Sequence, residues 1–153
     1  MPEARTRDYG AVPYEETDVI ELARPLPGFP GQLRFLMLRP RPEAGWIVLQ
    51  SLDDAATALL TLPAEMVDPD YEAQLTAEDH DALGWREGAP RALVLVTVAA
   101  GTDGRPAANL LGPIVVDPAR RRGLQAIRED RRYGAAEPVP LRCARNQEEV
   151  PCS

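Results

Sequence analysis

The chain has 153 residues, of which 44% are hydrophobic, so we expect one domain with a substantial core. Its formal net charge of -7, from 24 acidic and 17 basic residues, argues against binding to free nucleic acid, because the field of the protein repels phosphate. The same charge favours a basic protein partner, although an acidic balance can equally serve solubility alone. No stretch approaches the roughly 20 apolar residues that span a bilayer, and the N-terminus has no apolar run typical of a secretory signal. We therefore predict a cytoplasmic protein that does not bind membranes.

The two ends of the chain differ in composition from its middle. Residues 1–16 are polar and charged, with two prolines, and predict a flexible N-terminal arm. Residues 135–153 are polar and Pro-rich and predict a flexible C-terminal tail, which carries both Cys143 and Cys152. No cysteine lies upstream to pair with them, so we expect free thiols or one adventitious disulfide. The folded domain is predicted to span residues 17–134.

Short apolar runs separated by Pro and Gly predict strands in the first half of the domain. In chain order these runs are 18–23, 33–38, 46–50, 57–62 and 71–75. The fourth run could also form a short helix, but we favour a strand. Between the first two runs, residues 25–31 include three prolines and two glycines, which exclude a helix or a central strand. This segment is predicted to be a loop whose Leu26 and Phe29 pack inward.

The clearest helix signal is the charged segment 76–84. Thr76 stands where an N-cap is expected, Asp79 follows three residues later, and Gly84 can end the helix. This pattern predicts a helix of about two turns.

Three more strands are predicted after this helix. They are the runs 91–100, 113–117 and 123–128, with a hairpin turn at 101–104. The first is almost continuously apolar, which predicts burial on both faces. Together with the earlier runs they predict a mainly β fold: a compact, antiparallel, β-barrel-like single domain with one or two short helices.

The sequence offers few residues for catalysis or metal binding. His80, the sole histidine, lies in the predicted helix beside residues that do not face it, so we interpret it as solvated. No phosphate-binding loop, nucleophile elbow or four-ligand zinc pattern is present, and we predict no enzyme activity, cofactor or metal. A carboxylate-based hydrolase is the alternative, because two facing acidic side chains cannot be recognised in a sequence. An RNA-binding β-barrel is disfavoured, because it needs a basic groove with stacking aromatics, and the basic run 120–122 is too short.

Polar residues in two settings are candidates for function or for structure. Four acidic residues in or near predicted turns either are simply solvated or form an acidic face for a basic partner: Asp53, Asp54, Asp70 and Glu72. Asn109 and Gln125 lie within apolar segments, so we expect them to be buried polar struts whose amides are hydrogen-bonded.

Five short segments occur in one order between residues 18 and 133. They read Leu26-Pro-Gly-Phe, Leu49-Gln-Ser-Leu-Asp-Asp, Asp68-Pro-Asp-Tyr-Glu, Ala108-Asn-Leu-Leu-Gly-Pro-Ile-Val-Val-Asp and Gly123-Leu-Gln-Ala-Ile, and Tyr133 follows them. This series resembles the flagellar assembly factor family FliW, whose pattern is G-L-x-G-F, L-Q-S-x-x-D, P-x-Y, x-N-L-x-A-P-I-V-I-N and G-x-Q-x-I. Pro25 and Gly112 depart from the pattern, which has Gly and Ala at these places.

The resemblance implies a compact β-barrel-like fold and a role without catalysis. Members of the family bind flagellin in the cytoplasm and bind the translational repressor CsrA, which relieves repression of flagellin translation until flagellin titrates the factor away. The resemblance also marks five residues as structural motif positions: Leu26, Phe29, Asn109, Pro113 and Gln125. A FliW-like binding module with a different client is the alternative.

Overall fold

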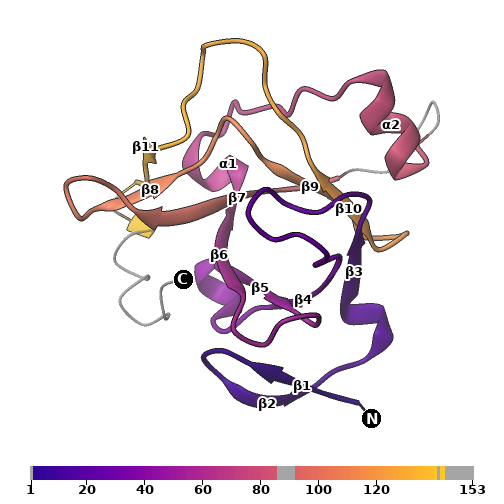
Figure 1. Cartoon of the computed structure of the whole chain (residues 1–153). Helices are drawn as coiled ribbons and strands as arrows, with labels where there is room; N and C mark the ends of the chain where they lie inside the picture. Colours follow the sequence, from indigo (N-terminus) through magenta and orange to yellow (C-terminus); the bar gives the residue numbers. More distant parts are fainter. Residues whose placement is uncertain (1, 86–91, 141, 144–153) are drawn as a thin grey trace.

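In the part of the chain that the structure describes, seven strands form a closed β-barrel (Figure 1). The computed structural model describes residues 2–85, 92–140, 142 and 143. The barrel strands are β3 (Val19–Leu22), β4 (Arg34–Leu38), β5 (Ile47–Ser51), β6 (Ala58–Pro63), β7 (Leu93–Ala100), β9 (Ile114–Asp117) and β10 (Arg122–Gln125). Their order is β7-β6-β5-β4-β3-β10-β9, and β9 pairs with β7 to close the barrel. The predicted mainly β, barrel-like fold is confirmed, with the difference that β3 and β10 pair in parallel.

Strand β7 has different partners along its length. Its first residues pair with β9, and its last three pair with β8 (Pro106–Ala108), which carries the two-residue strand β11 (Glu137–Pro138) on its outer edge. On its opposite edge, β7 pairs with β6 only from Leu95 to Thr97. Strands β6 and β7 therefore diverge beyond this point, as Figure 1 shows.

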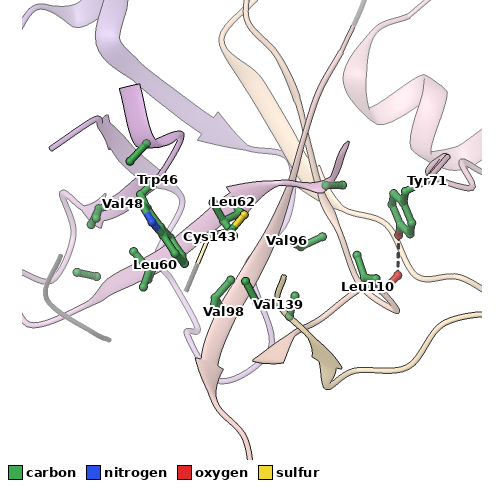
Figure 2. Close-up of a cluster of buried hydrophobic side chains, with 14 residues drawn as sticks. Trp46, Val48, Leu60, Leu62, Tyr71, Val96, Val98, Leu110, Val139 and Cys143 are labelled. Atoms are coloured by element: carbon green, nitrogen blue, oxygen red, sulfur yellow. Dashed lines mark hydrogen bonds between the residues drawn. The ribbon is translucent and has the colours of Figure 1, made fainter. Parts of the chain in front are cut away.

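Alternate residues of the barrel strands form two separate apolar clusters, as the period of two along a strand requires. One cluster takes residues from strands all around the barrel and so fills its interior: Ile20, Leu22, Leu26, Phe35, Ile47, Leu49, Leu95, Ile114 and Val116. The other lies on the outer face of β5 to β8 and includes Trp46, Leu60, Leu62, Val96 and Val98 (Figure 2). Each fully buried Leu or Val side chain contributes about 1.5–3 kcal/mol.

The predicted helix is confirmed as α2 (Ala77–Leu83). The Thr76 hydroxyl accepts from the Asp79 N–H at 3.1 Å, the Asp79 carboxylate accepts from the Thr76 N–H, and Gly84 ends the helix with a φ of 71°. Arg24, just after β3, donates to the Asp79 carboxylate at 2.7 Å and to the carbonyl of Gln125 at 3.0 Å. The helix is thereby attached to both strands of the parallel pair.

The predicted strand at 71–75 is wrong. These residues form no β-ladder. Their contacts to the rest of the chain are made by side chains. The Tyr71 hydroxyl donates to the Leu110 carbonyl at 2.6 Å (Figure 2), and the Gln74 amide donates to Asp130 at 2.9 Å. Alternation along so short a segment did not distinguish these contacts from strand pairing.

Both predicted flexible ends contain structure. Within residues 1–16, β1 (Glu3–Thr6) and β2 (Gly10–Pro13) form an antiparallel hairpin, and Ala4 packs against Val19 and Leu36. Near the C-terminus, Val139 and Cys143 are buried in the outer cluster. Residues 141 and 144–153, with Cys152, lie outside the described residues.

Three short helical segments complete the described elements: η1 (Glu16–Asp18), η2 (Pro42–Ala44) and α1 (Ala64–Val67). None of the helices in the described ranges has the length and apolar character needed to cross a membrane.

Replacing Asp79 tests the attachment of α2. Burial by itself raises the pKa of Asp79, but the hydrogen bonds from Arg24 and the Thr76 N–H outweigh it and hold the pKa below its ordinary value. The ionised carboxylate therefore stabilises the fold above about pH 4, and this contribution is lost as the pH falls through the folded-state pKa. We expect Asp79→Asn to lower the free energy of unfolding by about 1–2 kcal/mol at pH 7, measured by urea denaturation.

The difference between the wild type and Asp79→Asn should shrink as the pH falls below about 4 toward the folded-state pKa of Asp79. The control is Asp81→Asn, which makes the same charge change at an exposed position of the same helix. Equal effects of the two substitutions at pH 7 would contradict a specific role for the Arg24–Asp79 pair.

Candidate functional site

An apolar groove of about 650 Å³ opens where β6 and β7 diverge. The groove is lined by the tip of the β1–β2 hairpin, the loop after β3, the turn before β6, strands β6 and β7, and the chain around β8 to β10. The residues are Arg7, Leu26, Pro27, Phe29, Ala56, Thr57, Ala58, Leu59, Thr97, Val98, Ala99, Asn109, Ile114, Gln125 and Ile127. Its volume is in the range of ligand-binding pockets. Arg7 is the sole charged residue among the described residues that line the groove, in a chain with a net charge of -7.

Four motif residues from distant parts of the sequence meet at this groove. Leu26 is buried and Phe29 is half-buried, and both belong to the loop that packs over the barrel interior. Asn109 and Gln125 come from a later part of the sequence, just after β8 and at the end of β10. All four line the groove. Pro113 precedes β9 directly, and Ile114, the residue after it, lines the groove as well. Sequence reasoning identified these residues singly but did not place them together.

The amides of Asn109 and Gln125 hold one short piece of backbone between them. The Asn109 side-chain oxygen accepts from the N–H groups of Leu111 and Gly112 at 3.1 and 3.0 Å. The Gln125 amide donates to the Gly112 carbonyl at 3.0 Å. Both side chains are half-buried. They therefore fix the chain at Gly112 and also present polar groups to the groove.

Ile127 is the one large apolar side chain that the described part of the chain leaves exposed, at 55%. Sequence reasoning missed it. The buried residues Leu124, Ala126 and Arg128 alternate along this segment, so the period of two places Ile127 on the same side as Gln125. That alternation could have identified it as a residue facing away from the core. An exposed apolar residue beside an apolar groove is typical of a binding surface.

Gln50, quoted in the second motif but given no role, connects the N-terminal hairpin to the groove. It is completely buried, and its amide donates to the carbonyls of Ser51, Ala55 and Thr57 at 3.0–3.1 Å. Its oxygen accepts from the backbone N–H of Arg7 at 3.0 Å. Arg7 lies at the tip of the hairpin, and its guanidinium contacts Asp8 at 2.7 Å and donates to the Ala58 carbonyl at 3.2 Å.

The four acidic candidates come from two separate segments of the chain. Asp53 and Asp54 lie in the turn before β6, whereas Asp70 and Glu72 lie after α1, which follows β6. The six residues of β6, about 20 Å of extended strand, lie between the two pairs in the chain. All four are exposed.

Two carboxylates of this set have local structural roles, and that of Asp54 accepts from the Ala56 N–H at 2.9 Å within its own turn. Asp53 accepts from the backbone N–H groups of Leu33 and Arg34 at 2.8 and 3.1 Å, which joins the β5–β6 turn to the start of β4.

A buried arginine that sequence reasoning missed holds the segments around Tyr71 and Tyr133 together. Arg128 is 7% exposed, and its guanidinium lies 5.1 Å and 4.9 Å from the centres of the two rings. It pairs with Asp130 at 2.7 Å, and this hydrogen bond is the main cause of the raised pKa of Arg128 and the lowered pKa of Asp130. The Tyr133 hydroxyl donates to Asp68 at 2.6 Å, which lowers the pKa of Asp68 and raises that of Tyr133.

The arrangement offers little to catalysis. No carboxylate, histidine or cysteine is among the described residues that line the groove. His80 is exposed, with its ring 5.9 Å from that of Trp85. No group of three or more His, Cys, Asp or Glu side chains in the described ranges is arranged to hold a metal ion. The groove can bind apolar groups and offer amide hydrogen bonds.

Comparison with known proteins identifies the family. The FliW protein family matches residues 3–139. The chain belongs to the FliW family. The flagellar assembly factor FliW of Geobacter sulfurreducens is 29% identical over 142 residues, covering 93% of this chain and 89% of that protein. The FliW proteins of Geotalea uraniireducens and Desulfovibrio desulfuricans are 32% identical over 133 residues and 36% identical over 110 residues, covering 87% and 70% of this chain and 81% and 66% of those proteins.

The fold agrees with this assignment. A crystal structure of the flagellar assembly factor FliW superposes with a TM-score of 0.80 at 23% sequence identity, covering 90% of this chain and 96% of that one. The FliW resemblance of the five sequence segments is therefore confirmed, and the barrel with its diverging β6 and β7 belongs to a FliW protein.

The contact between Gly112 and Gln125 can be tested by a double-mutant cycle. A Cβ atom added at Gly112 would lie 2.7 Å from the Gln125 amide nitrogen, so Gly112→Ala must displace that amide from the Gly112 carbonyl. We expect Gln125→Ala to cost about 1 kcal/mol of unfolding free energy in the wild type and much less in Gly112→Ala, by urea denaturation.

The control for this cycle is Gln74→Ala in both backgrounds, because Gln74 bonds to Asp130 and not to this part of the backbone. Its effect should be additive with Gly112→Ala. Additive effects of Gln125→Ala would show that its amide does not stabilise the Gly112 backbone.

Proposed function

We propose that this chain is a non-catalytic flagellar assembly factor of the cytoplasm, which binds flagellin in a chaperone-like manner and antagonises a CsrA-type translational repressor. Membership of the FliW family is the observation that carries the proposal, since its relatives are named flagellar assembly factors. The apolar groove supports a binding role, because it combines an exposed Ile127 with amide groups, and the described residues that line it include no acid–base pair.

The two partners suit different parts of the surface. A flagellin subunit that has not yet assembled exposes apolar surface that its neighbours later bury, and the largely apolar groove matches such a surface. A repressor that binds RNA carries basic surface, and the exposed acidic residues, including Asp53, Asp54, Asp70 and Glu72, provide the complementary charge.

Competition between the partners would make the protein a switch. A binder that holds the repressor frees flagellin translation, and accumulating flagellin then takes the binder away and restores repression. Such a switch needs only different affinities for two states and no chemical step. A FliW-family protein with another client is the alternative, and it predicts binding to neither flagellin nor the repressor.

Calorimetric titration of Ile127 variants with flagellin from the same source tests this function and its site. We expect saturable binding by the wild type, competition by the CsrA-type repressor, and flagellin affinity about 5- to 30-fold weaker for Ile127→Ser, because a hydroxymethyl group buries much less apolar area.

Ile127→Leu is the matched control and should keep nearly wild-type affinity, because it preserves the apolar area. Since the side chain is exposed at 55%, neither variant should lose much stability. Saturable binding that is identical for Ile127→Ser and Ile127→Leu would move the flagellin site away from the groove, whereas no binding to either partner would refute the function.

A further inference from the structure

The edge of β6 that faces the groove extends beyond its pairing with β7. The two strands pair at Thr61–Thr97, Leu62–Val96 and Pro63–Leu95. Continued in the same register, the ladder would place Leu59 opposite Ala99, but the pairing ends before these residues. Leu59 and Ala99 instead both line the groove. The groove is thus an opening between two strands of the sheet.

On the β6 side, the backbone of Ala58 points into this opening. In an antiparallel ladder, alternate residues direct both their N–H and C=O groups to the same neighbouring strand. The Thr57 carbonyl accepts from the Ser51 N–H at 3.0 Å, so Thr57 faces β5. Ala58, the next residue, therefore faces the opening, in agreement with the Arg7 guanidinium at its carbonyl.

The same alternation applies on the β7 side. The Thr97 carbonyl accepts from the Asn109 N–H at 2.9 Å, so Thr97 faces β8. Val98, opposite Leu60 in this register, directs its backbone to β6 at the end of the ladder, and Ala100 two residues later directs its backbone toward the opening. Both strands thus present backbone groups to the space between them.

Arg7 lies at the β6 edge, where an added strand would pair. Its guanidinium donates to the Ala58 carbonyl at 3.2 Å, while Asp8 and the buried Gln50 hold Arg7 in place. The Arg7 side chain comes from the tip of the N-terminal hairpin, and it is the one hairpin residue among the described residues that line the groove. A side chain at this position covers the edge of the sheet, as charged residues do on other exposed edges.

The groove lining indicates which segment fits. It consists mostly of apolar residues, with small side chains at Ala56, Ala58 and Ala99, and the charge of Arg7 is paired with Asp8. A partner with a basic surface would find no acidic side chain among the described residues that line the groove. An extended apolar segment gains both backbone hydrogen bonds from the open edge and burial of alternate side chains in the groove.

We propose that an apolar segment of flagellin binds in extended form as an added strand between the β6 and β7 edges of this opening, and that it displaces the Arg7 guanidinium from the Ala58 carbonyl. The inference rests on the proposed function for its partner. A segment that binds as a helix would contact the apolar lining but would leave the backbone groups of both edges unprotected.

Amide hydrogen exchange of the full chain, alone and saturated with flagellin, tests the added strand. We expect exchange of the Ala58 and Ala100 amides to slow by about tenfold or more in the complex, because they become hydrogen-bonded. The Thr61 and Leu95 amides lie in the existing ladders and serve as internal references. This measurement needs no substitution.

Flagellin affinity of two hairpin variants tests the role of Arg7. Arg7→Met removes the guanidinium from the edge, and we expect it to bind flagellin about 2- to 10-fold more tightly, because the segment no longer competes with Arg7. Arg5→Met removes the same charge from an exposed position of the same hairpin and should leave the affinity unchanged.

The outcomes separate this inference from the proposed function. A flagellin complex with unchanged exchange at both edge amides overturns the added strand, and weaker or equal binding by Arg7→Met overturns the displacement of Arg7, while the proposed function stands in either case. Absence of any complex with flagellin or with the repressor overturns the proposed function and this inference together.

Discussion

The pairing of β7 is the constraint on which the rest of the structure depends. Its first residues close the barrel against β9, and its last residues leave the barrel to pair with β8. The β6–β7 ladder ends after three residue pairs, where β7 changes its partner on the opposite edge from β9 to β8. The groove is the consequence of this divergence. A continuous sheet would otherwise cover the interior cluster between β6 and β7. Leu26 and Phe29, from the loop between β3 and β4, cover part of it instead.

The groove keeps its shape because polar side chains fix the backbone around it. Asn109 and Gln125 hold Gly112 on one side, and Gln50 holds the β5–β6 turn and the hairpin tip on the other. Each of these amides satisfies backbone groups that would be costly to leave without a partner. A site formed in this way is largely preformed, which lowers the entropic cost of binding an extended partner. It also suits a protein that exchanges one partner for another.

Much of the barrel could be predicted from the sequence, because its strands are apolar runs between Pro and Gly, and α2 carries its own capping residues at Thr76, Asp79 and Gly84. The hairpin at the N-terminus could not be predicted, because its residues are mostly polar. It is held to the barrel by the packing of Ala4 and by contacts to distant residues such as Gln50. Tyr71 had strand-like neighbours but uses its hydroxyl in a tertiary contact. Asn109 and Gln125 were recognisable as unusual polar residues, but their convergence on Gly112 depends on the chain's path. Arg7 and Arg128 gave no signal, because one arginine among 17 looks like a solvated charge until its neighbours are known.

The central claim is that the opening between β6 and β7 is where the flagellin partner binds. Amide NMR spectra of the isotope-labelled chain, recorded during titration with unlabelled flagellin, test it most directly. The account predicts that the largest shifts fall on the backbone amides of Ala58 and Ile127 and on the side-chain amides of Asn109 and Gln125. Shifts confined to the turns around Asp53 and Asp70, with the groove resonances unchanged in a saturated complex, would contradict it.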